Sequence, residues 1–217
     1  MSTEELNTLA WVSLAVAFGC AAAIVFDMFV GGRRPAMRIM EIVWPVTALY
    51  LGPLALAGYR LWGRGGHRQW PMPVATTLAV SHCGAGCTLG DIIGSSLVLV
   101  LGLEVSGLGL WAELPLDFAL AYLLGIAFQY FTIAPMRGLG VRDGLAAALK
   151  ADTLSLVAFE VGLFGWMILV QLVFFPGHLH ADEPFFWMMM QIGMALGFMT
   201  AYPVNWWLVR VGWKESM

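Results

Sequence analysis

The sequence predicts an all-α membrane protein, a single domain that forms a bundle of about six transmembrane helices. Hydrophobic residues fill 60% of the 217 positions and charged residues only 12%, whereas a soluble domain carries about a quarter charged residues. The mean hydropathy is +0.79. Six apolar stretches are each long enough to cross a bilayer, which takes roughly 20 residues, and they leave no length for a soluble domain.

The expected spans are divided by polar breaks rich in Gly and Pro, such as "GGRRPAMR", "MRGLGVRDG" and "FPGHLHADEP". The first follows an acidic start, "MSTEELN", which lacks the basic residues of a cleavable signal peptide, so we expect it to stay in the protein. The second contains Pro45 and Pro53, and the third holds the polar run "HCGAGC". In order, the spans cover residues 7–30, 41–62, 73–103, 114–136, 144–175 and 184–211.

The Lys and Arg residues of the short loops predict the orientation, because they favour the cytoplasmic side. Six spans and an inner N-terminus place seven of them inside: Arg60, Arg64, Arg68, Arg137, Arg142, Arg210 and Lys214. Three lie outside, in the first loop: Arg33, Arg34 and Arg38. This split predicts a multi-pass protein of a cell inner membrane with both termini in the cytoplasm. If the second segment were re-entrant, the N-terminus would instead lie outside.

A group of polar side chains in the third span forms one stripe. At about 100° per residue, Cys83 and Cys87 lie about 40° apart on a helix, and Asp91 lies about 40° further on. Glycines at four-residue spacing predict that a neighbouring helix approaches closely beside this stripe: Gly86, Gly90 and Gly94. We therefore expect the thiols to face the interior of the bundle.

Thiol, imidazole and thioether groups together are typical ligands of a soft metal ion, Cu(I) first and Zn(II) second. We expect His82, Cys83 and Cys87 to bind the metal, and Met190 and Met194, which share a helix face, to complete the site. Singly, a buried Cys or Met is most often a packing residue, but ionisable groups inside a membrane are costly and usually functional.

Other polar residues have supporting roles in this hypothesis. Asp91 and Glu160 would orient ligands or carry protons, and Gln191 lies near the Met190 and Met194 face. Residues in the first and last loops could capture the ion at the outer mouth: Met37, Met40, His178 and His180. Weaker candidates for the polar interior are Asp27, Glu41, Gln129 and Asn205.

Four segments carry a resemblance: "SHCGAGCTLGDIIG", "GIAFQYFTIAPM", "KADTLSLVAFEVG" and "GFMTAYPVNWWLVRVGWKESM". They resemble the membrane family known as domain of unknown function 4396, of which HCGAGC is the most distinctive element. The resemblance implies a bacterial multi-span protein that handles a soft metal, and it implies no particular reaction.

The sequence leaves other functions open. A membrane thiol oxidoreductase would use Cys83 and Cys87, although CxxxC on a regular helix orients the Cβ atoms poorly for a disulfide. A structural or accessory subunit of a membrane complex would use neither. We do not expect a conventional enzyme. The expected partners are the lipid bilayer and either a metallochaperone or a second copy of the chain. The net charge of −3 offers no basic surface for nucleic acid.

Overall fold

The computed structural model describes residues 3–64, 70–105, 108–175 and 179–214. These residues form helices and no strand, which confirms the all-α class. Five helices are long and apolar enough to cross a membrane, so the chain has the helices of a membrane protein. They are α1 (Thr3–Phe29), α4 (Met72–Leu101), α5 (Leu110–Arg137), α6 (Val141–Leu169, continued by the π-helical turn η2, Val170–Phe174) and α7 (Pro184–Arg210).

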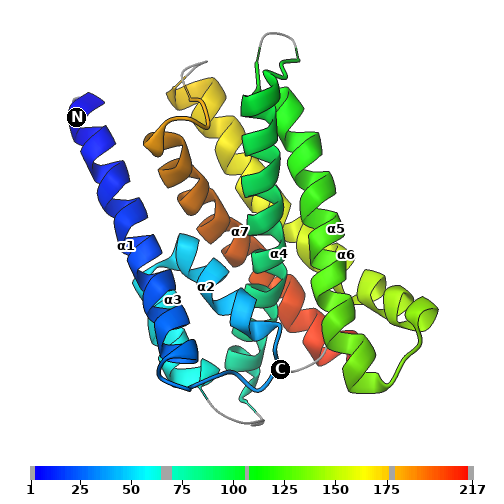
Figure 1. Cartoon of the computed structure of the whole chain (residues 1–217). Helices are drawn as coiled ribbons and strands as arrows, with labels where there is room; N and C mark the ends of the chain where they lie inside the picture. Colours follow the sequence, from blue (N-terminus) through cyan, green and yellow to red (C-terminus); the bar gives the residue numbers. More distant parts are fainter. Residues whose placement is uncertain (1–2, 65–69, 106–107, 176–178, 215–217) are drawn as a thin grey trace.

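Helix α4 lies at the centre of the bundle (Figure 1) and packs against α2, α5, α6 and α7. Helix α6 packs between α5 and α7, while α1 lies at the edge and contacts α2, α3 and α7. The most apolar window of α4 is 56% buried, against 17% for α1. The polar run of the third expected span is therefore carried by the most enclosed helix.

The second expected span does not form one crossing helix. It consists of α2 (Met40–Leu51), α3 (Pro53–Gly58) and the π-helical turn η1 (Tyr59–Gly63). Gly52 joins α2 to α3 with φ of +51°, a backbone conformation that favours glycine. In Figure 1, α2 rises into the bundle and α3 returns toward the end from which α2 started. We call α2, α3 and η1 the re-entrant hairpin.

The tip of the re-entrant hairpin is held by a residue far away in the sequence. Pro53 has no N–H to donate to the carbonyl oxygen of Leu49, four residues earlier. The side-chain amide of Gln191 in α7 donates to that oxygen instead, at 2.7 Å, and accepts a hydrogen bond from the Ser13 hydroxyl of α1, also at 2.7 Å. Backbone groups freed inside a membrane are tolerated only with such partners.

The base of the hairpin is fixed at the end of α1. The Asp27 carboxylate accepts hydrogen bonds from Arg64 Nε and Nη2, at 2.9 and 2.8 Å, and from Arg33 Nη1 at 2.9 Å. The Tyr59 hydroxyl lies 2.9 Å from the same carboxylate. The hairpin thus enters and leaves the bundle at one end, and Asp27 has a structural role there.

This arrangement changes the expected topology. The five helices that are long enough to cross a membrane, together with the hairpin, place the two termini at opposite ends of the bundle (Figure 1). Six spans with both termini inside would place them at the same end. The first loop lies at the same end as the loop between α5 and α6. As a result, all the Lys and Arg residues that the structure describes lie toward the end with the C-terminus: Arg33, Arg34, Arg38, Arg60, Arg64, Arg137, Arg142, Lys150, Arg210 and Lys214.

Candidate functional site

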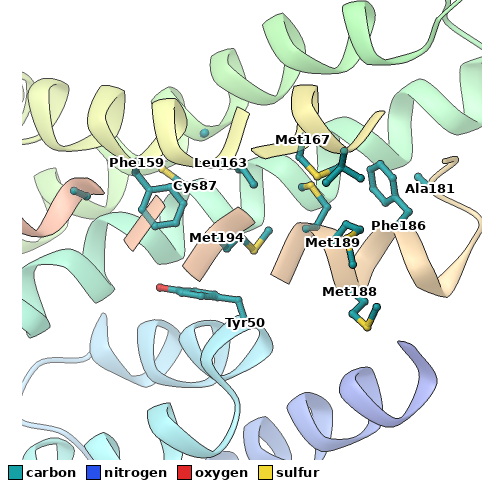
Figure 2. Packing of buried hydrophobic residues seen from close by; sticks show 14 of the residues in the cluster. Tyr50, Cys87, Phe159, Leu163, Met167, Ala181, Phe186, Met188, Met189 and Met194 are labelled. Atoms are coloured by element: carbon teal, nitrogen blue, oxygen red, sulfur yellow. The ribbon is translucent and has the colours of Figure 1, made fainter. Parts of the chain in front are cut away.

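The two thiols of α4 lie inside the bundle, as their spacing predicts. Cys83 and Cys87 are both 0% exposed and both are free thiols. Cys87 lies beside Cys83 and beside the carboxyl group of Glu160 in α6. Figure 2 shows Cys87 in the same part of the core as Phe159 and Met194. A buried thiol pair is therefore the centre of the candidate site.

Close packing between α4 and α5 keeps this face of α4 in place. A Cβ added at Gly86 would lie 2.8 Å from the Cα atom of Gly125, well inside the usual contact distance between carbon atoms. Gly90 and Gly94 meet α5 in the same way. The prediction that these glycines let a neighbouring helix approach is confirmed, and the neighbour is α5.

Tyr50, at the tip of the re-entrant hairpin, belongs to the site although the sequence did not single it out. It lies within electrostatic range of both cysteines and packs edge-on against Phe159, with ring centroids 6.3 Å apart. Gly84 makes room for it, because a Cβ there would lie 2.8 Å from the Tyr50 hydroxyl oxygen. The signal that could have found Tyr50 is the run "YLGP", which marks the break in the second segment.

Three buried carboxyl groups extend from the thiols toward the end with the N-terminus. Asp91, Asp117 and Glu160 are 0%, 4% and 2% exposed, and Asp91 lies within electrostatic range of the other two. In the part of the chain that the structure describes, the carboxyl oxygens of Asp91 and Glu160 and Oδ1 of Asp117 have no hydrogen-bond partner. Ser95 donates to Oδ2 of Asp117 at 3.1 Å. Among the described residues, none of the three forms an ion pair.

Asp117 and Glu113 were missed at the sequence level, yet their spacing of four residues places them on one face of α5. A small cavity, of about 10 Å³, lies between these two carboxyl groups, Leu163 and Met167 of α6, and Met190 of α7. The row of carboxyl groups therefore reaches one of the predicted methionine ligands.

A larger cavity, of about 350 Å³, is lined by residues of α1, α2, α4 and α7. Met190 and Met194 line it together, as their spacing predicts, and so does Gln191. Thr88, next to Cys87 in the sequence, also lines this cavity, and its hydroxyl oxygen lies 3.6 Å from the Met194 sulfur. Gln191 is already bonded to the hairpin, so the structure gives it a positioning role.

His82 does not join the cysteines. Its Nε2 atom lies 2.8 Å from the Thr132 hydroxyl oxygen of α5, and its ring packs edge-on against Phe128. Neighbouring residues on a helix diverge by about 100°, so the face that carries Cys83 cannot also carry His82. No group of three His, Cys, Asp or Glu side chains able to hold a metal ion occurs in the part of the chain that the structure describes.

The four residues expected to capture a metal do not form one surface. Met37 and the buried Met40 follow α1 and lie at the end with the C-terminus. The re-entrant hairpin returns the chain to that same end. His180 is exposed at the opposite end, in the segment before α7. His178 lies outside the described residues. Met37 and Met40 therefore lie at the opposite end of the bundle from His180, and capture of a metal at either end stays a prediction.

Comparison with known proteins gives one match. No curated protein and no solved structure matches the chain. The sequence model of a family described as DUF4396, domain of unknown function, matches residues 72–214, which include α4 to α7 and both thiols. Because that match covers more than half of the sequence, the chain belongs to the DUF4396 family.

Proposed function

We propose that this protein binds a soft transition-metal ion, Cu(I), inside the bundle and passes it across the membrane. The thiolates of Cys83 and Cys87 would bind the ion, and the Met194 thioether would be a third soft ligand. The observation that carries the proposal is the adjacent pair of thiols, fully buried in the most enclosed helix. Soft sulfur ligands favour Cu(I) over harder ions.

The surroundings of the thiols support a route for a cation. The cavity of about 350 Å³ extends from Asp182 and Pro184, at the start of α7, to Thr88 and Met194. The thioethers of Met190 and Met194 line this cavity, and most of its other lining residues are apolar. Flexible thioethers bind Cu(I) without the cost of losing a proton, so they suit transient binding ahead of the thiols.

The buried carboxyl groups support the sign of the transported charge. Glu113, Asp117 and Asp91 extend from the same end of the bundle toward Glu160, which lies beside Cys87. Buried acidic groups near a binding site favour cations over anions. His82 lies on another face of α4, so we leave it out of the ligand set.

The distribution of charge supports an orientation. Since positive loops favour the cytoplasm, the end with the C-terminus would face the cytoplasm of a bacterial cell and the N-terminus would lie outside. Asp182 and the start of the cavity would then face away from the cytoplasm. This is the orientation expected for a re-entrant second segment.

Metal analysis of the purified protein tests the proposal. We expect about one copper ion per chain after purification with Cu(I) under reducing conditions, and loss of that copper in Cys83→Ser/Cys87→Ser. Cys20→Ser is the matched control, because Cys20 is also a buried free thiol but belongs to the cluster around α1 and α2. Retention of stoichiometric copper in the double variant would overturn the proposal, and zinc in place of copper would overturn the choice of ion.

The same protein distinguishes the other functions. A reversible disulfide between Cys83 and Cys87 in place of metal binding would favour a thiol oxidoreductase. Both sulfurs are 0% exposed, and thiol–disulfide exchange requires access to the sulfur, which argues against that reading. A cysteine double variant that keeps the full phenotype of the wild type would favour an accessory subunit.

A further inference from the structure

The last described residues of the chain carry an ammonium group into the bundle. After α7, Gly212 adopts φ of +72° and reverses the chain, and the backbone N–H groups of Trp213 and Lys214 donate to the carbonyl oxygen of Leu208. The Lys214 side chain is 0% exposed. The Lys150 ammonium lies over the Trp213 ring, 4.3 Å from its centroid. We call residues 211–214 the tail.

Lys214 Nζ lies in a group of oxygen atoms from α6 and α7. It donates to Asp152 Oδ1 at 2.8 Å and to Ser155 Oγ at 3.3 Å. Asn205 Nδ2 donates to the same Ser155 oxygen at 2.6 Å and so fixes its position. These contacts join the tail to the two helices at a fully buried point.

This group has more acceptor atoms than the ammonium uses. Asp152 Oδ2 and Asn205 Oδ1 are buried and have no hydrogen-bond partner among residues 3–64, 70–105, 108–175 and 179–214. Gly125 of α5 packs against this carboxylate, since a Cβ there would lie only 3.2 Å from Asp152 Oδ2. Unused buried acceptors are costly unless a donor or a cation satisfies them.

We propose that Asp152, Ser155 and Asn205 form a binding site for an alkali-metal cation, and that Lys214 is a tethered occupant that competes with the ion. Carboxylate, hydroxyl and amide oxygens are ligands for hard cations. A single carboxylate is balanced by one positive charge, so a monovalent ion replaces the ammonium without leaving excess charge in a buried site. The thiol site would bind a soft ion through sulfur, so the two sites differ in both ligands and cargo.

Exchange between Lys214 and an ion requires little movement of the fold. The chain turns at Gly212, beyond the last residue of α7, so withdrawal of Lys214 leaves the contacts between α6 and α7 in place. An ion at Asp152 would release the tail from the bundle, and the tail would exclude the ion when bound. The cation concentration at that end would therefore set whether the tail is docked.

The test uses thermal unfolding of the full-length protein in detergent, with NaCl, KCl or choline chloride at equal ionic strength. In Lys214→Ala the site is open, so we expect saturable stabilisation by Na⁺ or K⁺ but not by choline, with a midpoint at least about tenfold lower than in the wild type. Lys214→Ser also removes the ammonium and most of the side chain and should behave in the same way, which covers poor folding of the alanine variant.

Two further variants make the result specific. Asp152→Asn/Lys214→Ala should lose the response, because the only carboxylate of the site is gone. Arg142→Ala removes an exposed positive charge at the same end and should respond as the wild type does. Equal responses of Lys214→Ala and Lys214→Ser to sodium and choline salts, or a response that survives Asp152→Asn, would overturn the proposal.

Discussion

Replacing Gly86 by alanine tests whether the close contact between α4 and α5 holds the thiol face in position. The added Cβ would lie 2.8 Å from the Cα atom of Gly125 and 2.9 Å from its nitrogen. Carbon atoms pack best at roughly 3.5–4.0 Å, so the two backbones must separate by about 1 Å. Neither backbone can rotate away as a flexible side chain would.

The expected cost follows from a matched glycine. Gly165, on the exposed side of α6, has no heavy atom within 4 Å of an added Cβ. Both substitutions gain the same helix preference, about 0.5–1 kcal/mol. Their difference therefore isolates the steric term, and overpacking costs about 1–3 kcal/mol. We expect Gly86→Ala to be less stable than Gly165→Ala by about that amount.

Thermal or denaturant unfolding in detergent micelles measures this difference, and copper binding gives a second readout. Cys87 follows Gly86 directly, so a shift of α4 should also weaken copper binding in Gly86→Ala and leave it unchanged in Gly165→Ala. Equal stability of the two variants would refute the close-packing account of the glycine stripe.

Two more predictions concern the hairpin and the orientation. Gln191→Leu removes the donor to the Leu49 carbonyl and should lower the free energy of unfolding by about 1–2 kcal/mol. Ser13→Ala leaves that donor in place and should cost less. Equal losses in the two variants would contradict the role of Gln191 in holding the tip of the hairpin. In intact cells, a membrane-impermeant maleimide should label Glu4→Cys, whereas Arg142→Cys should react only after lysis. The native cysteines are buried and should give little background labelling. The reverse pattern would contradict an outer N-terminus.

The helical parts of the site could be predicted because they depend on local geometry. A rotation of about 100° per residue places Cys83, Cys87 and Asp91 on one stripe, beside glycines that need a close neighbour, and the structure agrees on both points. The same geometry places His82 and Cys83 about 100° apart, although the sequence analysis expected both residues to bind one metal ion. The different faces of His82 and Cys83 could therefore be predicted from the sequence alone.

The hairpin depends on contacts that the sequence does not display. Residues 41–62 are long and apolar enough to cross a membrane, so length alone favours a span. The turn at Gly52 is stabilised by Gln191, which lies 142 residues beyond Leu49. The same holds for Lys214, whose loop position in the sequence gives no sign of its buried partner Asp152.

The approach of separate helices also assembles the carboxyl groups. Asp91, Asp117 and Glu160 come from α4, α5 and α6, and only the packing of these helices brings them near one another. Asp117 stands close to the start of an apolar stretch, where a carboxylate would ordinarily be solvated. Gly94 of α4 has no side chain, and the Asp117 carboxyl group packs into the space that a Cβ there would fill.

Anaerobic titration of the purified protein with Cu(I), in competition with a chromophoric Cu(I) chelator, tests the central claim most directly. The account predicts about one tightly bound ion per chain in the wild type and in Cys20→Ser, and none that withstands the chelator in Cys83→Ser/Cys87→Ser. Equal Cu(I) binding by the wild type and the double variant, or no binding by either, would contradict it.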